Sequence, residues 1–243
     1  MKPIPIFYPD GILLADKPPE WTSHDVCQFL KKWFQIEKIG HAGTLDPIAT
    51  GLLVLLIGKA TKKSNEFMGH DKDYAGVIRL GVKTDSQDKS GKVLETRDPS
   101  AVTLEEMIEK AKAFTGDILQ VPPMVSALKH QGVRLYKLAR QGREVEREAR
   151  PVTVFQFEML SKEGPLVRFF TRVSKGTYVR TLVNDLGEAL GCFATLEELR
   201  RVRSGQFLAG DSLTIDALRN LTPQELRTKI ISIYPASAHV RPE

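Results

Sequence analysis

Apolar residues near the N-terminus follow two different repeats. Gly11 to Ala15 and Leu52 to Ile57 are short, nearly continuous apolar runs, which is typical of strands that are buried on both faces. Between them, after the capping residues Thr22 and Ser23, apolar side chains recur at helical spacing, at Val26, Phe29, Leu30, Trp33 and Phe34. The pattern predicts a strand, a helix whose apolar stripe faces the core, and a buried strand.

The rest of the chain mixes both repeats without strict alternation of strand and helix. The predicted strands are Tyr74 to Leu80, Val152 to Leu160 and Leu166 to Ser174. The predicted helices are Leu104 to Thr115, Arg134 to Gln141, Tyr178 to Leu190, Leu196 to Val202 and Thr214 to Leu221. Capping-box spacing occurs at Thr103 with Glu106 and at Thr195 with Glu198, and predicted helix ends are followed by Gly116, Gly142 and Gly191. We therefore predict an α+β fold with a mainly antiparallel, mixed central sheet flanked by helices and loops.

Composition sets limits on the class of protein. The 243 residues include 35 Lys and Arg, 30 Asp and Glu, and 42% hydrophobic residues, which is ordinary for a globular chain. Cys27 and Cys192 form no CxxC motif, which argues against a redox pair, a zinc ribbon and a disulfide scaffold. No apolar run approaches the roughly 18 residues that span a bilayer, and the N-terminal residues lack the apolar stretch of a signal peptide. We expect one domain over residues 1–243, located in the cytoplasm.

The net charge of +5 favours a polyanionic partner, and the placement of the charge says more than its sum. Basic residues gather at Lys129, Arg134, Lys137, Arg140, Arg143, Arg147 and Arg150. A second group consists of Arg200, Arg201 and Arg203. Each group by itself is equally compatible with a solvated helix face or loop. Tyr136 moves the balance slightly toward RNA, because phosphate contacts and base stacking often occur together.

The sequence contains no complete motif for binding a cofactor or a metal ion. Gly58-Lys59 resembles the end of a phosphate-binding loop, but the hydroxyl residue and the first glycine of that motif are missing. The five histidines have no ligand-like spacing to one another or to the cysteines. We expect no metal ion and no cofactor.

A glycine-punctuated segment, residues 40–51, leads directly into the predicted strand Leu52 to Ile57. Loops on rigid strands often hold functional groups, and glycines allow another molecule to approach the backbone closely. Pro47 favours an extended conformation at Asp46. An isolated Asp-Pro pair usually does no more than initiate a turn, but its context here makes Asp46 a candidate for chemistry.

This segment is one of six motifs that follow one another in the chain: GILLADKP (11–18), GHAGTLDPIATGLL (40–53), DKDYAGVIRLGVKTDSQDKSG (71–91), PPMVSALKHQGVRLYKLARQG (122–142), REARPVTV (147–154) and SKGTYVRTLVNDLGEALG (174–191). The series covers about residues 11–207 and resembles the TruB family, the pseudouridine synthases that act on uridine 55 in the T-loop of tRNA. The resemblance implies the pseudouridine synthase fold. It also implies a cofactor-independent isomerase that cleaves the C–N glycosidic bond, turns the uracil and rejoins it through carbon.

The resemblance implies three catalytic residues. Asp46 matches the aspartate of the family's GTLDP motif and would be the nucleophile, attacking either the sugar or the base. Arg180 matches the arginine that pairs with this aspartate, although an exposed helical arginine paired with Asp185 or Glu188 is the alternative. Tyr74 matches a tyrosine that stacks on the target base, where otherwise a core tyrosine is expected.

The resemblance also implies residues that bind the substrate. Because a stacked uridine must be flipped out, His41 would fill the space that the base leaves. Tyr178 and Leu199 would line the uracil pocket, and Lys17 would support the active-site loop. The basic stretch coincides with the family's tRNA-clamping loop, here about residues 122–150, with Lys129, Arg140, Arg143 and Arg147 as candidate contacts to the T-arm.

One feature departs from the family pattern. Many bacterial members continue into a small RNA-binding module called PUA, and residues 208–243 are too few for that module. We expect a catalytic domain without PUA that acts as a monomer. Two alternatives share the same motifs, namely a tRNA-folding chaperone with little catalysis and a related synthase that acts on another uridine.

Overall fold

Strand β3 (Thr50–Ile57) divides its apolar side chains between two hydrophobic clusters in the computed structural model. Leu53, Leu55 and Ile57 pack with residues of helix α1 (Ser23–Trp33), whereas Leu52, Val54 and Leu56 belong to a cluster that includes Phe67 of helix α2 (Ser64–Met68). Successive side chains of a strand point to opposite faces, so a wholly apolar run is covered on both sides. The prediction of a strand buried on both faces is confirmed.

The structure describes residues 6–126, 128–139 and 141–233, and the chain forms two compact units. Unit 1 contains residues 1–70 and 201–243, and unit 2 contains residues 71–200. Besides the elements already given, unit 1 contains β1 (Gly11–Lys17), β2 (Ile39–His41), the 3-10 helix η1 (Gly58–Lys63), β13 (Phe207–Leu208), the 3-10 helix η2 (Ala209–Asp211), β14 (Leu213–Thr214), α6 (Ile215–Arg219), α7 (Pro223–Lys229) and β15 (Ile231–Ser232).

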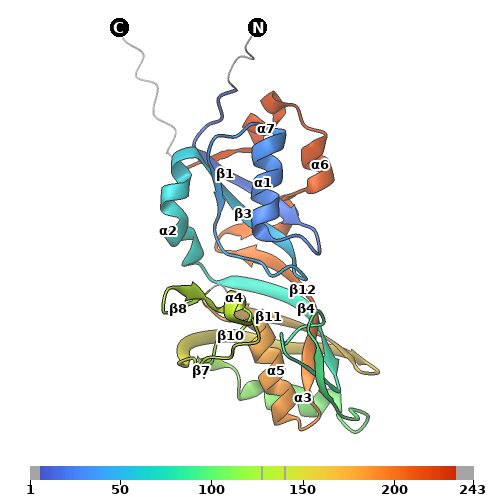
Figure 1. Ribbon diagram of the computed structural model, residues 1–243. Helices are drawn as coiled ribbons and strands as arrows, with labels where there is room; N and C mark the ends of the chain where they lie inside the picture. The colour runs from blue at the N-terminus through green and yellow to red at the C-terminus, as the bar shows by residue number, and fades with distance from the viewer. Residues whose placement is uncertain (1–5, 127, 140, 234–243) are drawn as a thin grey trace, which may run out of the picture. The chain divides into compact units, whose positions relative to one another are not determined.

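Unit 1 is built around the antiparallel pair of β1 and β3. Its sheet has the order β14-β1-β3-β12, where β12 is Ala194–Ser204 and continues into this unit from unit 2. Helices α1, α6 and α7 cover one face of the sheet, and α2 lies on the other (Figure 1). The short pair of β1 and β14 is parallel, whereas β2 and β15 add antiparallel pairs.

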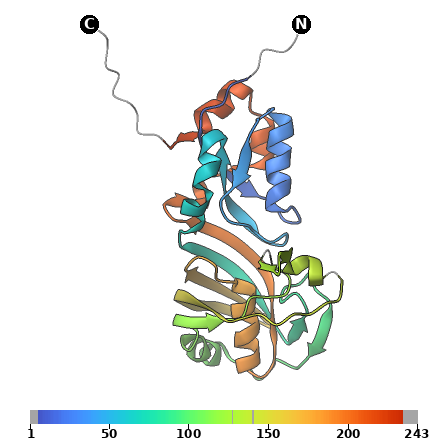
Figure 2. The ribbon, with the colours of Figure 1, turned by 60° about the vertical axis from the view of Figure 1, so that its left-hand side comes forward.

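Unit 2 has the sheet order β12-β4-β11-β10-β7, in which β4 with β11, β11 with β10 and β10 with β7 form antiparallel pairs. Its strands are β4 (Lys72–Leu80), β5 (Val82–Thr84), β6 (Val93–Thr96), β7 (Gly116–Gln120), β8 (Lys129–His130), β9 (Val133–Arg134), β10 (Arg150–Glu163) and β11 (Leu166–Val173), and its helices are α3 (Leu104–Lys112), α4 (Leu135–Ala139) and α5 (Val179–Ala189). Helix α3 packs against β10 and α5 at one end of the unit (Figure 2). The predicted mainly antiparallel sheet is confirmed, and the single-domain organisation stays a prediction.

Most predicted elements match observed ones within a few residues, and the caps explain several of their ends. Thr103 accepts a hydrogen bond from the backbone N–H of Glu106 at the start of α3, as predicted. Gly191 follows α5 with a φ of +73° and donates its N–H to the Glu188 carbonyl. Gly142 has a φ of +68° and donates to Ala139. Both glycines adopt the left-handed conformation that terminates helices.

Three local predictions are wrong. Residues Leu196 to Val202 lie in β12, because this segment pairs with neighbouring strands of the sheet. The Thr195 hydroxyl lies 3.0 Å from that of Thr84 instead of capping a helix. Trp33 is 56% exposed because it lies at the C-terminal end of α1, where its ring makes a tilted contact with Phe29. Gly116 begins β7, because α3 ends earlier and Ala113 is its C-cap.

The close packing of α5 against the start of β12 gives a test of the fold. A Cβ atom at Gly187 would overlap the backbone N of Ala194 and lie 2.5 Å from the carbonyl carbon of Phe193. We expect Gly187→Ala to lower the free energy of unfolding by about 1–3 kcal/mol, because helix and strand must separate. Gly210→Ala is the matched control, because its Cβ meets nothing within 4 Å, and it should change stability by less than about 0.5 kcal/mol. Urea denaturation measures both, and equal stabilities would contradict the packing described.

Candidate functional site

The loop between β2 and β3 carries Asp46, and a buried lysine donates a hydrogen bond to the backbone of this loop. Lys17, the last residue of β1, is fully buried. Its Nζ donates hydrogen bonds to the carbonyl oxygens of Pro18 at 2.8 Å, Trp21 at 2.6 Å and Pro47 at 3.2 Å. Pro47 directly follows Asp46, so the ammonium fixes the backbone beside the candidate nucleophile. These three hydrogen bonds are charge-assisted, and the role of Lys17 as a support of the active-site loop stays a prediction.

The residue before Asp46 is held as firmly as the residue after it. The Ser23 hydroxyl accepts from the Leu45 N–H at 2.8 Å and donates to the Leu45 carbonyl at 3.3 Å. The N–H of Glu20 donates to the Pro47 carbonyl at 2.8 Å. The sequence predicted Ser23 only as a residue near the start of a helix, and nothing in its local pattern indicated this contact across 22 positions. The half-buried Asp46 thus lies between two anchored neighbours.

The electrostatics of the loop follow from the burial of its cations. Burial lowers the pKa of Lys17 to about 8, the Asp46 carboxylate opposes this change, and the Arg201 guanidinium adds to it. At neutral pH Lys17 therefore remains mostly charged, with a positive charge close to Asp46. A nearby positive charge favours the ionised form of a carboxylate, which a nucleophile requires.

His41 lies on β2 at the entrance to the same loop and is half-buried. Burial lowers the pKa of its imidazole, and the positive charge of Arg201 and the neighbouring His24 contribute in the same direction. The ring is therefore neutral at neutral pH. Its Nδ1 is buried, and no described residue offers it a hydrogen-bond partner. A flat, neutral ring with one unused polar edge is compatible with contact to a base.

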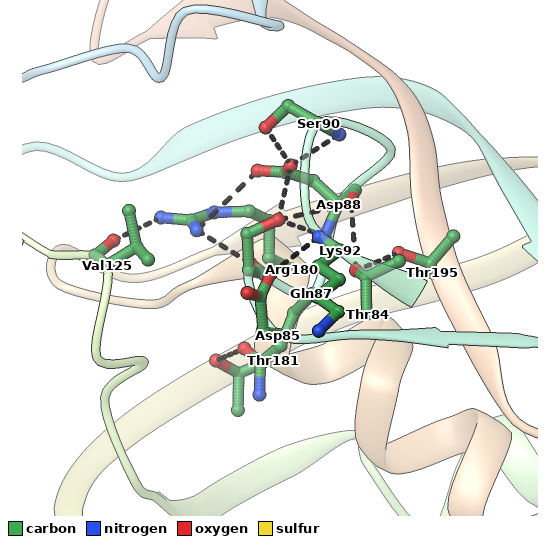
Figure 3. Close-up of polar contacts among 11 residues, drawn as sticks. Thr84, Asp85, Gln87, Asp88, Ser90, Lys92, Val125, Arg180, Thr181 and Thr195 are labelled. Atoms are coloured by element: carbon green, nitrogen blue, oxygen red, sulfur yellow. Dashed lines mark hydrogen bonds and ion pairs between the residues drawn. The ribbon is translucent and has the colours of Figure 1, made fainter. Parts of the chain in front are cut away.

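Arg180 projects from α5 into the turn that links β5 and β6, as Figure 3 shows. Its side chain is 2% exposed, and the guanidinium donates to the carbonyls of Ser86 and Val125, each at 2.9 Å. It also lies 3.6 Å from the Asp88 carboxylate. The alternative of an exposed helical arginine is therefore wrong, because the buried guanidinium is turned away from solvent.

The 85–91 turn is itself tightly bonded, and sequence analysis did not identify its central residue, Asp88, as part of the site. The Asp88 carboxylate accepts from the Ser86 hydroxyl at 2.7 Å and from the N–H and hydroxyl of Ser90 at 3.0 and 2.5 Å. The Thr84 hydroxyl donates to the Asp88 carbonyl at 2.8 Å (Figure 3). The dense series of hydroxyl and carboxyl residues at 84–90 was the available signal.

The remaining predicted pocket residues lie on regular elements of unit 2. Tyr74 is in β4, 8% exposed and opposite Thr171 of β11. Tyr178 is the N-cap of α5, and its backbone is held by the Gln120 side chain, which accepts from the Tyr178 N–H at 2.8 Å and donates to its carbonyl at 3.1 Å. Leu199 is buried in β12. Gln120 is a second residue that sequence analysis did not single out.

The predicted RNA-clamping loop has little regular structure. Lys129 is in the short strand β8, and Arg140 lies outside the described residues. Arg143 is exposed, and Arg147 is partly buried with its Nη2 3.5 Å from Glu144. Exposed arginines outside helices and strands are free to follow an RNA backbone, whereas Arg147 would first leave Glu144.

Within residues 6–126, 128–139 and 141–233, no group of three or more His, Cys, Asp or Glu side chains is placed to hold a metal ion. No helix in these ranges has the length and apolar character that crossing a bilayer requires.

The lowered pKa of Lys17 gives a pH-dependent prediction. Its pKa is about 8 in the folded chain and 10.5 in the unfolded chain, so the unfolded state holds more protons between these values. The burial of the charge costs stability below pH 8, and this cost is lost as the pH rises toward 10.5, at up to about 1.4 kcal/mol per pH unit. We expect the free energy of unfolding of wild type minus that of Lys17→Met to rise between pH 8 and 10. Lys59→Met is the control, because the Lys59 side chain is 75% exposed. A flat difference for Lys17 in urea titrations would contradict the assignment.

Comparison with known proteins places this geometry in a family. Residues 31–179 match the model of the TruB family pseudouridylate synthase N-terminal domain, and residues 180–233 match that of the tRNA pseudouridylate synthase B C-terminal domain. The protein named tRNA pseudouridine synthase B from Opitutus terrae is 48% identical over 231 residues, which cover 95% of this chain and 96% of that protein. The protein of the same name from Syntrophotalea carbinolica is 43% identical over 227 residues, covering 93% and 74%.

A solved structure agrees with the sequence matches. A chain of a Cbf5-Nop10-Gar1 complex is 31% identical and superposes with a TM-score of 0.71, over 91% of this chain and 60% of that one. This chain thus spans less than two thirds of the solved protein. The likeness confirms the predicted α+β pseudouridine synthase fold. By its two domain matches and by relatives aligned over nearly all of its length, this chain belongs to the TruB family of pseudouridine synthases.

Proposed function

We propose that this enzyme isomerises uridine 55 in the T-loop of tRNA to pseudouridine, without a cofactor. Membership in the TruB family and the shared name of its relatives support tRNA as the substrate. The observation that carries the proposal is the loop of Asp46, where one carboxylate lies between two residues that are anchored by buried side chains. Such a loop presents a carboxylate in one position, as covalent catalysis requires.

Asp46 acts as the nucleophile in this proposal. Its carboxylate attacks the ribose or the uracil, the N-glycosidic bond breaks, the uracil turns, and a bond from carbon to carbon replaces the bond from carbon to nitrogen. The reaction begins and ends with the same atoms and oxidation state, so it needs no electron carrier. The positive charge of Lys17 favours the ionised nucleophile at neutral pH.

Arg180 and Tyr74 complete the proposed catalytic group. Both lie in unit 2. Arg180 supplies positive charge for the carboxylate, and Asp88 with the Ser86 and Val125 carbonyls orients its guanidinium. Tyr74 stacks on the uracil, which a rigid position in β4 supports.

The remaining residues bind the flipped nucleotide and the RNA backbone. His41 occupies the space that the base leaves, and its neutral, flat ring can take the place of a base in the RNA stack. Tyr178 and Leu199 line the uracil pocket. The clamping loop binds the T-arm phosphates through Lys129, Arg140, Arg143 and Arg147, by charge and shape more than by base reading. Action as a monomer stays a prediction.

Site-specific detection tests the function, because isomerisation leaves the mass of the RNA unchanged. The enzyme is incubated with unmodified tRNA, and pseudouridine is located by chemical modification and primer extension. We expect it at position 55 alone, in whole tRNA and in an isolated T-arm hairpin. Pseudouridine at another position would favour a related synthase. Altered tRNA folding without any pseudouridine would favour a chaperone.

The nucleophile is tested by Asp46→Asn, which keeps the shape of the side chain and removes its negative charge. We expect single-turnover activity to fall by about a thousandfold or more, while the Kd for tRNA stays within about threefold of wild type. Asp216→Asn is the control, because that side chain is 86% exposed, and its rate should match wild type. A rate within about tenfold of wild type for Asp46→Asn would remove Asp46 from the central role.

Arg180→Lys tests the planar geometry of the guanidinium. An ammonium keeps the charge but donates from a single nitrogen, whereas the guanidinium reaches Ser86 and Val125 from two separate nitrogens, Nη1 and Nη2. We expect the single-turnover rate to fall at least about tenfold. Loss of one buried hydrogen bond should also lower the free energy of unfolding by about 1–3 kcal/mol. Arg168→Lys, at an exposed position of β11, is the control. A wild-type rate and melting temperature in Arg180→Lys would show that the planar guanidinium is not needed.

A further inference from the structure

Arg201 is the largest fully buried side chain of the described residues, although its sequence neighbours mark it as one of three arginines in a basic surface group. It lies in the part of β12 that belongs to unit 1 and is 1% exposed. Among the described residues, no carboxylate lies within ion-pair distance of its guanidinium. An arginine buried without a carboxylate is costly, so the contacts that it does make need a reason.

Both of its hydrogen bonds go to the backbone that frames the Asp46 loop. The Nε donates to the Leu52 carbonyl at 2.7 Å, and the Nη2 donates to the Gly43 carbonyl at 3.2 Å. Gly43 lies before Asp46 and Leu52 lies after it. One rigid guanidinium therefore joins the two ends of the loop. Gly43 has a φ of +103°, a conformation that glycine adopts without strain.

We propose that Arg201 is a positioning residue, which closes the base of the 43–52 loop and thereby aims Asp46 at the target nucleotide. The inference rests on the proposed function of Asp46. It assigns Arg201 a different task from Lys17 and Ser23, which hold the residues next to Asp46. With its base closed and its tip held on both sides, the loop has little freedom left. Misplacement of a reacting group by about 1 Å can reduce a rate by about a hundredfold.

The charge of Arg201 has a second consequence at the same loop. It lowers the pKa of Lys17 and of His41, in each case after the larger effect of burial. The other charged or titratable groups that act on these two side chains are Asp46 and Asp25 for Lys17, and His24 for His41. Loss of the charge at position 201 should therefore raise both pKa values, whereas loss of the fork geometry alone should not.

Arg201→Lys separates geometry from charge. A lysine keeps the positive charge but has no planar fork that reaches two carbonyls at once. We expect the single-turnover rate to fall about 10- to 100-fold while the Kd for tRNA stays within about threefold. Amide hydrogen exchange at Ala42 and Leu45, whose N–H groups donate to the Val54 carbonyl and to the Ser23 hydroxyl, should become at least about tenfold faster. The pKa of His41, followed by NMR, should stay at its wild-type value.

Arg201→Met removes geometry and charge together and should also raise the pKa of His41. Arg219→Met is the control, because Arg219 is an exposed residue of α6 in the same unit, and it should leave all three readouts unchanged. If Arg201→Met fails to fold, Arg201→Lys alone decides the proposal.

Wild-type rate and exchange in Arg201→Lys would overturn the proposal. So would a loss of rate no larger than the loss of folded protein, because that is the result of a purely structural role. If wild type forms no pseudouridine, the proposed function fails, and the exchange rates in Arg201→Lys still decide whether Arg201 holds the loop.

Discussion

The loop of Asp46 depends on positive charges that are buried against backbone carbonyls. Removal of an ammonium or a guanidinium from water costs several kcal/mol, and hydrogen bonds from the charged group offset this cost. Lys17 meets three carbonyl oxygens and Arg201 meets two. Each buried cation needs hydrogen-bond acceptors, so the backbone must place carbonyl oxygens around it. This need constrains the geometry of the chain. The loop conformation follows from that constraint.

The same principle recurs in unit 2, where Arg180 gathers carbonyls of Ser86 and Val125 and faces Asp88. The difference lies in the partner. Asp88 balances part of the charge and is itself bonded by the hydroxyls of Ser86 and Ser90. Two hydrogen bonds to carbonyls and the nearby Asp88 carboxylate together set the direction of the Arg180 guanidinium. Each unit thus presents a charged group on a braced backbone.

The scaffold that holds these loops follows from simpler forces. In unit 1 the alternating side chains of β3 are covered on both faces, which removes the strand from water and leaves its N-terminal end as a fixed support for the loop. In unit 2 the approach of Gly187 to the backbone of β12 brings α5, and with it Arg180, close to the sheet. Apolar packing positions the elements, and buried charges then orient the loops that join them.

Much of this protein was determined by local sequence. Apolar repeats and capping residues predicted the β1-α1-β3 order, the long antiparallel strands and α5, because these features depend on residues only a few positions apart. The motif series indicated the family, whereas the catalytic roles of Asp46, Tyr74 and Arg180 stay predictions. Only the tertiary structure decided that Leu196 to Val202 is a strand, because its backbone pairs with sheet strands that are distant in sequence. The tertiary structure alone showed that Arg201 is buried, because the sequence does not distinguish it from Arg200 and Arg203. Burial depends on which parts of the fold pack around a residue and not on its charge.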